Sequence, residues 1–290
     1  MGKRHGLLRH AAKAAKEQAQ KKVAPGSRSG PGSKPVTKTQ PGAGPPAAKK
    51  QKTGNNSRVQ QNQKPTIPFS PADSILLVGE GDLSFAASLI AHHKCTDVTA
   101  TVLEKDFAEL SAKYPHVSSN IAVIDNPFNP NCRLLYGIDA RKLHPPFTTS
   151  TTTTTSNKEN KQQRQGAMKR IIFNFPHTGG KSTDVNRQVR HNQELLVDFF
   201  RRAQHSLAPG GTIVVTLFEG EPYTLWNIRD LARHAGLQVQ RSFRFVAAAY
   251  PGYGHARTLG VVKNKRGEVA RHAWKGEERP ARSYVFVRKG

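Results

Sequence analysis

Acidic residues are scarce in this chain. Its 290 residues include 20 Asp and Glu against 45 Lys and Arg, which gives a formal net charge of +25. An excess of this size indicates a polyanionic partner, nucleic acid first and an acidic membrane second. The imbalance is greatest in residues 1–66, which hold 15 basic residues and one acidic residue and so carry +14. Because residues 23–64 are mainly Pro, Gly, Ser, Gln and Lys, we expect residues 1–70 to be a disordered basic tail before a folded domain at 71–290.

Cysteines and long apolar runs are also scarce. The two cysteines, Cys95 and Cys132, lack metal-ligand spacing and cannot form a disulfide framework, so we expect no metal site and a reducing intracellular environment. No apolar run approaches the roughly 18 residues that favour a membrane span, and the basic N-terminus lacks the apolar stretch of a secretion signal. The run at 49–52, Lys-Lys-Gln-Lys, resembles a nuclear or nucleolar address, although a solvated charge cluster looks the same. The address would place the protein in the nucleolus.

Strand-like and helix-like segments alternate from residue 75 onward. The pattern predicts strands at 75–78, 98–103, 134–138, 170–173, 212–218, 239–245 and 283–287, and helices at 83–93, 107–114, 186–207 and 225–235. This order is typical of an α/β fold with a doubly wound, mostly parallel sheet and a late antiparallel strand, as in class I (Rossmann-like) methyltransferases. A Thr-rich, low-complexity insertion at 148–168 is expected to be a tolerated spacer, because lengthening a surface loop costs little free energy.

A glycine turn follows the first predicted strand. Gly79-Glu80-Gly81-Asp82 lets a ligand approach the backbone, and the amides at the start of the following helix are expected to be free for polar or anionic ligand groups. The third glycine of a dinucleotide fingerprint would fall at Ser84, so the pyrophosphate-binding form is not met. Two acids in the turn also repel phosphate. The turn therefore favours a nucleoside with a cationic or zwitterionic tail, which describes S-adenosylmethionine.

Polar residues end the next three predicted strands. Glu104 lies 23 residues after Gly81, where an acid can hold both ribose hydroxyls, a spacing that suits NAD as well. Asp139 stands where an adenine amino group is usually met, and Asn174 follows the fourth strand. Carboxyl ends of parallel strands share one edge of a sheet, so these residues predict a nucleoside site there. The alternative is that the acids are simply solvated.

The sequence Asn174-Phe175-Pro176-His177 resembles the Asn-Pro-Pro-Tyr type of motif in enzymes that methylate planar nitrogens. Phe175 is placed to stack on a base, which contributes about 1–3 kcal/mol; a core Phe followed by a turn Pro is the alternative. Residues 177–183 look like the end of a phosphate-binding loop. The leading glycine of that loop would be residue 175, which is Phe, so the loop is rejected.

Longer motifs resemble one family. Residues 78–82, 174–190, 217–226, and 250–253 with 255–257 are similar to the large-subunit ribosomal RNA uridine-N3 methyltransferase family of fungal type, and the resemblance spans about residues 73–288 without the insertion. It implies a Rossmann-like enzyme that uses S-adenosylmethionine on a ribosomal uridine, with ribosomal RNA or pre-ribosomal particles as partners. Leu83 stands where the family usually has Phe.

The resemblance also implies where the ligands bind. It places the methyl donor at Gly79, Glu80, Gly81, Asp82, Glu104, Asp139 and Asn174. On the matching motifs we place the substrate RNA at Phe175, Arg187, Arg190, Tyr250, Tyr253, His255 and Arg257. It does not identify a catalytic base.

Methylation at uridine N3 requires the loss of an imide proton. We expect His177 to accept this proton, Lys181 to pair with the oxygen that gains charge, and Asp184 to be the next candidate. Alternatively, His177 only orients its loop and Lys181 contacts a phosphate. Two other functions stay open from the sequence: an NAD-dependent oxidoreductase, and a non-catalytic RNA-binding assembly factor with a relic nucleoside-binding fold.

Overall fold

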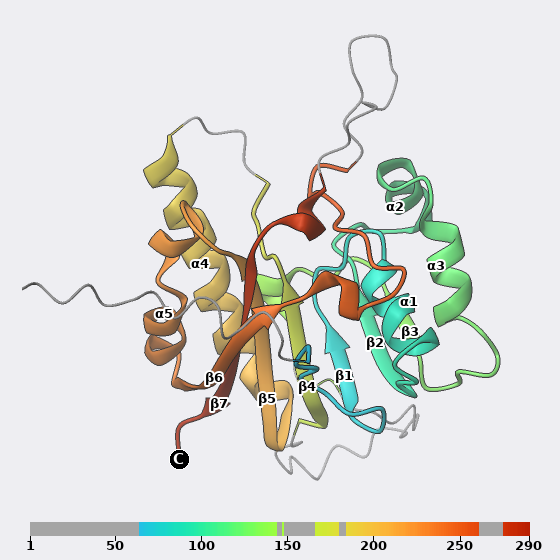
Figure 1. The fold of residues 1–290 in the computed structure, drawn as a ribbon, viewed down its shortest axis with the longest axis horizontal. Helices are drawn as coiled ribbons and strands as arrows, with labels where there is room; N and C mark the ends of the chain where they lie inside the picture. Colours follow the sequence, from blue (N-terminus) through green and yellow to red (C-terminus); the bar gives the residue numbers. More distant parts are fainter. Residues whose placement is uncertain (1–63, 144–146, 148–165, 180–183, 261–274) are drawn as a thin grey trace, which may run out of the picture. The chain divides into compact units, whose positions relative to one another are not determined.

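The computed structural model describes residues 64–143, 147, 166–179, 184–260 and 275–290 (Figure 1). All of them belong to one unit by their contacts, Ser57–Gly290. Residues 1–63 of the predicted basic tail, with the run at 49–52, and most of the Thr-rich insertion lie outside the described residues. Residues 64–70, which the sequence analysis assigns to the tail, are described, and Ile67 and Phe69 pack against the core of the domain. No helix in the described ranges is long and apolar enough to cross a membrane.

Seven strands form a single sheet with the order β3-β2-β1-β4-β5-β7-β6. Their bounds are β1 Ser74–Leu77, β2 Asp97–Thr101, β3 Arg133–Leu135, β4 Met168–Asn174, β5 Leu207–Phe218, β6 Leu237–Phe245 and β7 Ala281–Arg288. Strands β1 to β5 pair in parallel, whereas β7 pairs antiparallel with both β5 and β6. This arrangement confirms the predicted doubly wound, mostly parallel sheet with a late antiparallel strand.

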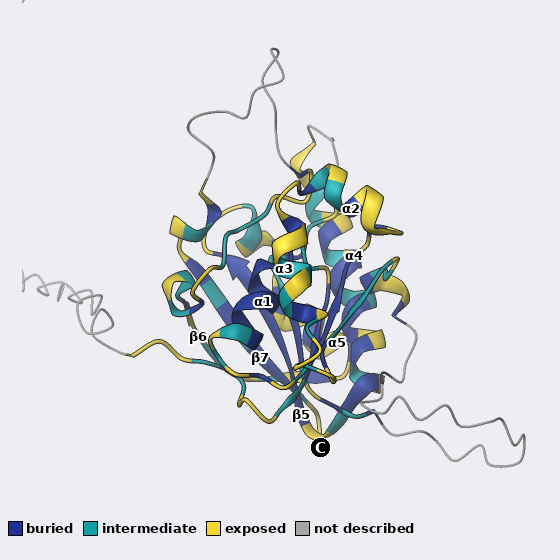
Figure 2. Cartoon of the chain, turned by 90° about the vertical axis from the view of Figure 1, so that its right-hand side faces the viewer, coloured by how far each residue is buried: buried dark blue, intermediate teal, exposed yellow. Residues whose placement is uncertain are grey.

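Helices cover both faces of the sheet (Figure 1). Their bounds are α1 Ser84–Ala91, α2 Phe107–Lys113, α3 Val117–Ile124, α4 Val185–Ala203 and α5 Ile228–His234. Alternate residues of β1 point to opposite faces. Ile75 and Leu77 join one core cluster with α1 and α3, and Leu76 joins the other with α4 and α5. Helix α1 lies buried behind α3, whose outer face is exposed (Figure 2).

Helix α3, the end of α4 and the start of β5 differ from the sequence prediction. Helix α3 was not predicted, because Ser118, Ser119 and Asn120 interrupt its apolar pattern and only its two ends, Val117 and Ile124, are buried. The helix predicted at 186–207 was extended too far at its end, and the strand predicted at 212–218 begins earlier, at Leu207. Helix α4 ends at Ala203 and a 3₁₀ turn follows, because the buried Leu207 starts β5 opposite Met168.

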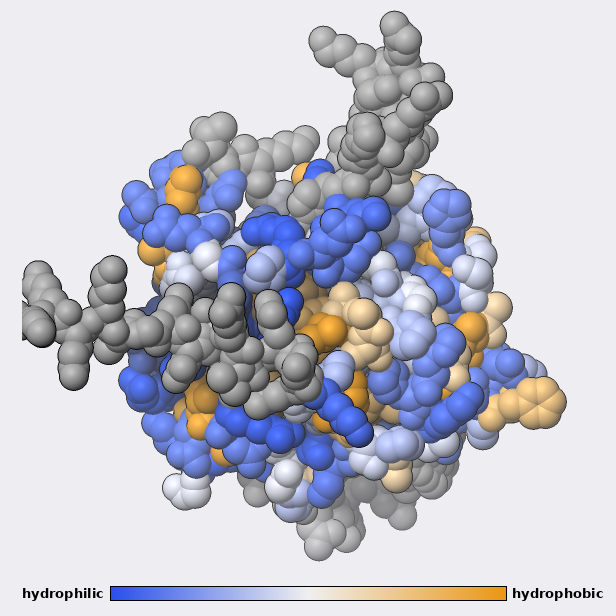
Figure 3. Space-filling model, in the orientation of Figure 1, coloured by the Kyte–Doolittle hydropathy of each residue, from blue (hydrophilic) through white to orange (hydrophobic). Residues whose placement is uncertain are grey.

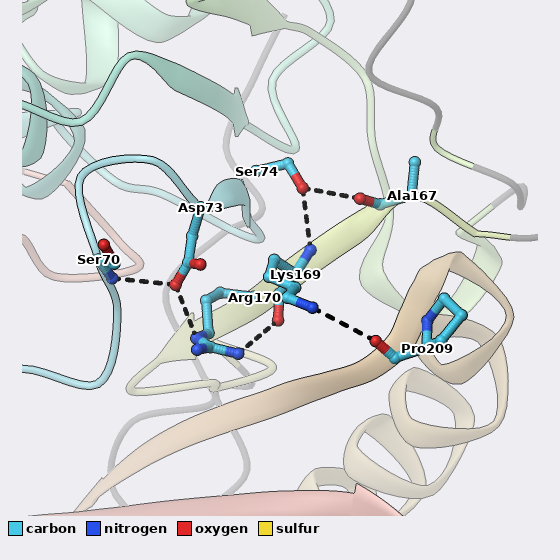
Figure 4. A network of polar contacts seen from close by, with 7 residues as sticks. All are labelled: Ser70, Asp73, Ser74, Ala167, Lys169, Arg170 and Pro209. Atoms are coloured by element: carbon cyan, nitrogen blue, oxygen red, sulfur yellow. Dashed lines mark hydrogen bonds and ion pairs between the residues drawn. The ribbon is translucent and has the colours of Figure 1, made fainter.

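A polar network fixes the N-terminal ends of β1 and β4 (Figure 4). Asp73 accepts a hydrogen bond from the Ser70 amide at 2.9 Å and forms an ion pair with Arg170 at 3.0 Å. The Ser74 hydroxyl donates to the carbonyl of Ala167 at 2.7 Å and accepts from the amide of Lys169 at 3.0 Å. These contacts hold the register of the two central strands at the end opposite the predicted site.

Candidate functional site

A cavity of about 460 Å³ lies at the carboxyl ends of the parallel strands. The loops after β1, β2, β3 and β4 line it together with the segment at 253–259, which we call the β6–β7 segment. Every residue predicted to bind the methyl donor lines this one cavity: Gly79, Glu80, Gly81, Asp82, Glu104, Asp139 and Asn174. The volume falls within the range of roughly 300–1,000 Å³ that is usual for small-molecule sites.

Two exposed apolar side chains line the cavity. Most of the surface in Figure 3 is hydrophilic, and few large apolar side chains are exposed among the described residues. Leu103 and Leu259, which are 59% and 63% exposed, are two of these few, and both line the cavity. The exposed lining residues also include Arg141, Arg257 and Thr258, so the opening offers both apolar and charged groups.

The glycine turn lets the backbone form one wall of the cavity. Gly79 has φ of 65°, and a Cβ there would lie 2.7 Å from Cε2 of Phe173. A Cβ at Gly81 would lie 2.8 Å from Cβ of Ala256 in the β6–β7 segment. Both glycines are therefore required by space, and Gly79 also by its backbone conformation.

The first amides of α1 are not free, which corrects the sequence prediction. Asp82 Oδ1 accepts a hydrogen bond from the amide of Ser84 at 3.0 Å, and Glu80 Oε2 accepts one from the amide of Ala86 at 3.2 Å. The chain's own carboxyl groups thus occupy the positive end of the helix. A cationic ligand group is therefore favoured beside this turn, and an anionic group is not.

Burial shapes the acidity of these two carboxyl groups. Loss of solvation raises the pKa of Glu80 to about 8, with a smaller contribution from the charge of Asp82, although the Ala86 amide opposes the shift. Burial also raises the pKa of Asp82, and Glu277 adds to it while hydrogen bonds from Ser84 oppose it. The described residues offer neither carboxyl group an ion-pair partner.

The other two predicted acids are paired. Glu104 is 5% exposed and forms an ion pair with Lys113 of α2, which also lines the cavity. Asp139 caps the short 3₁₀ turn Ala140–Lys142 and forms a 3.0 Å ion pair with Arg141. Burial alone would raise the pKa of Asp139, but the hydrogen bonds and charge of Arg141 outweigh it and lower that pKa.

The loop after β4 holds the residues predicted to meet the substrate base. Asn174 ends β4, and its buried Nδ2 atom has no hydrogen-bond partner among the described residues. Phe175 adopts φ of 51°, a conformation that costs a non-glycine residue on the order of 1–3 kcal/mol. Its ring packs 4.4 Å from the ring of Phe218 and 4.5 Å from that of His255, measured between centroids. Phe175 therefore belongs to the cavity wall, and its ring contacts hold it in this strained conformation.

His177 lines the cavity in a defined orientation. Its Nδ1 atom accepts a hydrogen bond from the amide of Gly179 at 2.8 Å, so the neutral ring carries its hydrogen on Nε2. Burial lowers the pKa of the ring, which favours that neutral form. The amide of Thr178, which lies between His177 and Gly179, donates to Oδ1 of Asn192 in α4 at 3.0 Å and anchors the loop. The ring therefore offers a hydrogen-bond donor at Nε2.

The other two catalytic candidates are placed differently. Lys181 lies outside the described residues. Asp184 is the N-cap of α4, where its side chain accepts a hydrogen bond from the amide of Arg187 at 3.2 Å, and it does not line the cavity. Its role in the structure is therefore to start α4.

Three of the predicted substrate residues in the later part of the chain line the cavity: Tyr253, His255 and Arg257. The hydroxyl of Tyr253 is hydrogen-bonded to Nδ1 of His255 at 3.1 Å. Burial and the nearby charges of Arg279 and Arg257 lower the pKa of His255 to about 4. At neutral pH the imidazole is therefore uncharged.

The remaining predicted substrate residues lie elsewhere. Tyr250 is 4% exposed and stacks on Phe245 at 5.3 Å between ring centroids, so it is part of the core. Arg187 and Arg190 lie on α4 and do not line the cavity.

Several residues of the site were not predicted from the sequence. Lys113, Tyr114 and Arg141 line the cavity, and the hydroxyl of Tyr114 donates to the carbonyl of Arg257 at 2.9 Å. The Arg279 guanidinium lies 4.3 Å from the centroid of the Phe218 ring. These positions carry no recognisable motif, because their place in the site depends on how the loops and helices after the strands pack.

The strand order and the cavity together define the class of the protein. A parallel sheet whose last strand is inserted antiparallel, with a nucleoside-sized cavity at its carboxyl edge, is that of a class I methyltransferase. The groups of the cavity fit its cofactor, S-adenosylmethionine: a glycine wall that a Cβ would obstruct, two unpaired acids for the cationic end, and the unpaired amide of Asn174.

Comparisons with known proteins give the family. A family model described as "BMT5-like: rRNA (uridine-N3-)-methyltransferase BTM5-like" matches residues 76–257, so the chain belongs to this family. The "25S rRNA (uridine(2634)-N(3))-methyltransferase" of Saccharomyces cerevisiae is 30% identical over 284 residues, covering 82% of this chain and 81% of the yeast protein. "Uncharacterized protein At4g26485" of Arabidopsis thaliana is 30% identical over 196 residues, covering 66% of this chain and 85% of that protein. The resemblance found in the sequence is confirmed, and the chain is a methyltransferase that uses S-adenosylmethionine.

Solved structures are more distant. The structure titled "Crystal structure of M. jannaschii TYW2 in complex with AdoMet" has 12% sequence identity and a TM-score of 0.37, covering 76% of this chain and 71% of that one. The pyocyanin biosynthetic protein PhzM has 13% identity and a TM-score of 0.40, covering 77% and 52%.

Proposed function

We propose that this enzyme transfers a methyl group to N3 of a uridine in large-subunit ribosomal RNA. The observation that carries the proposal is the single cavity that joins the glycine turn and its acids to a wall of Phe175, His255 and the unpaired amide of Asn174. Bound S-adenosylmethionine supplies an electrophilic methyl group on a sulfonium. The chain's own residues bind and orient the two reactants.

One side of the cavity holds the donor. Glu80 and Asp82 face its cationic end, because they are acids without an ion-pair partner among the described residues. Glu104 holds the ribose hydroxyls, and Asp139 lies at the adenine, where the apolar Leu103 and Leu259 border the opening. Lys113 and Arg141 hold these two carboxyl groups in place by ion pairs.

The other side holds the uracil ring. Phe175 and His255 offer ring faces and edges against which a base packs. Uracil presents carbonyl oxygens at O2 and O4 on either side of N3, and the Nε2–H of His177 is a donor of the kind these oxygens accept, while the unpaired Nδ2 of Asn174 lies at the donor side. Arg257 adds positive charge, which stabilises the oxygens as the N3 proton leaves.

The other two functions left open by the sequence are not favoured. An NAD-dependent enzyme needs amides at the start of α1 for a pyrophosphate, and Asp82 and Glu80 occupy them. A non-catalytic assembly factor would not need an unpaired amide and a strained Phe at the end of β4.

The proposed partners and location follow from charge. A net charge of +25, concentrated in residues 1–66, supports binding to ribosomal RNA within pre-ribosomal particles, and the basic run at 49–52 supports a nucleolar location.

The test is methylation of ribosomal RNA from cells that lack the protein. The purified full chain is incubated with S-adenosylmethionine carrying a labelled methyl group, and the digested RNA is examined for N3-methyluridine by mass spectrometry. We expect one labelled nucleoside, N3-methyluridine, at a single site in large-subunit RNA. Donor binding in calorimetry without any methylation of RNA or particles would contradict the proposal and favour the assembly factor.

A further inference from the structure

The methylation leaves one proton to be placed, and few groups in the cavity can take it. This inference rests on the proposed function. His177 has its Nδ1 occupied by the Gly179 amide and carries hydrogen on Nε2. His255, with a pKa of about 4, is too weak a base to keep the proton near neutral pH. Burial and neighbouring acids raise the pKa of Tyr253 far above 10, so its hydroxyl stays protonated.

The carboxyl groups of the cavity are not equivalent either. Glu104 is paired with Lys113, and Asp139 with Arg141. Asp82 is held within the turn by Ser84, whose amide donates to Oδ1 at 3.0 Å and whose hydrogen bonds oppose the rise that burial causes in the pKa of Asp82. Glu80 accepts one hydrogen bond, from the amide of Ala86 to Oε2 at 3.2 Å, and no partner of its Oε1 is found among the described residues.

Glu80 also borders the substrate side of the cavity. Its backbone amide is tied to the carbonyl of Thr101 at 2.9 Å, which fixes the turn. Its charge is the leading electrostatic influence on Tyr253, whose hydroxyl is bonded to His255 against Phe175. The ionisable groups around Glu80 are therefore Asp82 in its own turn, Tyr253 and His255 in the β6–β7 segment, and Glu277 beyond them. Helix α1 contributes no charged side chain.

We propose that Glu80 balances the charge of the bound donor's sulfonium and takes up the proton that uridine N3 releases. Before transfer the cavity holds a positive sulfonium, a neutral imide and a negative carboxylate. The S–CH₃ bond breaks with its electron pair left on sulfur, and the pair of the breaking N3–H bond forms N3–CH₃. The proton forms an O–H bond on Glu80. Both states are neutral overall, which matters in a site that is poorly solvated.

Because the pKa of Glu80 is high in the free protein, its proposed role can be tested by the protons released when the donor binds. Near pH 7 the carboxyl group is mainly protonated, and a bound sulfonium favours its ionised form. Binding of S-adenosylmethionine should therefore release close to one proton, and affinity should rise about tenfold per pH unit up to about pH 8, then level off. S-adenosylhomocysteine keeps the ammonium group of the tail but has a neutral sulfur. Because Glu80 is assigned to the sulfur, binding of S-adenosylhomocysteine should release far less.

The experiment is calorimetry of the full chain at pH 7 in buffers of different ionisation enthalpy, with each ligand in turn. Glu80→Gln, which mimics the protonated carboxyl group, should abolish the proton release and the pH dependence, and should slow single-turnover methylation by about 10²–10⁴-fold. Glu278→Gln, at an exposed acid outside the cavity, is the matched control and should behave as the wild type.

The outcomes separate the two proposals. If the wild-type chain binds S-adenosylmethionine without releasing a proton, the role of Glu80 is wrong while the methyltransferase stands. Methylation by Glu80→Gln at the wild-type rate would overturn its role as proton acceptor. If the wild-type chain methylates no uridine, the proposed function itself fails. The wild-type comparison of the two ligands needs no variant and so does not depend on how Glu80→Gln folds.

Discussion

At the scale of single residues, Glu104 carries the clearest expectation. A buried carboxylate that holds two ribose hydroxyls makes charge-assisted hydrogen bonds, each contributing on the order of 1.5–3 kcal/mol. Glu104→Ala should weaken donor affinity tenfold or more, measured by calorimetry, and leave the domain folded. Glu109→Ala, at an exposed acid of α2, is the control. Unchanged affinity in a folded Glu104→Ala chain would rule out the role.

His177 permits a test of two chemical roles at one position. The sequence predicts a base, and a base replaced in His177→Ala would lower turnover by about 10²–10⁴-fold. The hydrogen bond from Gly179 favours a donor at Nε2 instead, and a side-chain amide can replace a donor. We therefore expect His177→Gln to retain at least tenfold more single-turnover activity at saturating RNA than His177→Ala. Equal losses in the two variants would speak for the base.

Residue roles were predictable from the sequence only in part. The donor residues follow strands directly, so strand order alone brings Gly79, Glu104 and Asn174 to one edge. The partners of these residues, such as Lys113, depend on how helices pack and leave no local pattern. The same limit explains Tyr250, which has the aromatic character of a base platform but is buried against Phe245.

At the scale of elements, the β6–β7 segment closes the cavity by touching three other elements. The Ser84 hydroxyl of α1 and Gly254 are joined at 3.1 Å and 3.2 Å, and Tyr114 after α2 binds the carbonyl of Arg257. Thr258 lies against Gly179 in the loop after β4. The segment therefore couples the donor side of the cavity to the substrate side.

Substitutions at two glycines test whether the packing of this part of the chain against α2 supports donor binding. Gly260 and Gly252 have φ of 74° and 83°, so alanine is strained at both. A Cβ at Gly260 would lie 2.7 Å from the Lys113 carbonyl oxygen, whereas at Gly252 nothing lies within 4 Å. Gly260→Ala should displace the segment from α2 and weaken donor binding several-fold, while Gly252→Ala should cost about 1–2 kcal/mol of stability and leave binding intact. Calorimetry with thermal unfolding checks both, and equal donor affinities would contradict the coupling.

The elements themselves were mostly predictable. Continuous apolar runs such as the one in β1 are typical of buried parallel strands, and the three-residue spacing of Leu196 and Phe199 is typical of the apolar face of a helix such as α4. The missed helix α3 has only its two ends buried and is held by packing on α1. Propensity is a weak guide where tertiary contacts decide.

At the scale of the whole molecule, charge is distributed unequally. Residues 1–66 carry +14, and the remainder of the chain carries +11. The cavity, in contrast, gathers Glu80, Asp82, Glu104 and Asp139 in a chain that has only 20 acidic residues. Attraction for RNA and binding of the donor are thus assigned to different parts of the sequence, and they should be separable by truncation.

Removal of residues 1–66 should leave donor affinity unchanged and weaken RNA affinity. Each phosphate contact that is lost removes counterion release, so the logarithm of the RNA binding constant should fall less steeply with the logarithm of salt concentration. A change in slope of several units is expected, because 15 basic residues are removed together with one acid. Fluorescence anisotropy with labelled ribosomal RNA between low and physiological salt measures the slope for both chains. A matched chain in which the basic residues of 1–66 are replaced by Gln separates charge from length, and it should behave like the truncated chain. If the truncated chain keeps the wild-type slope, the contacts with phosphate lie on the folded domain, and the basic residues of α4, Arg187 and Arg190, become the next to replace.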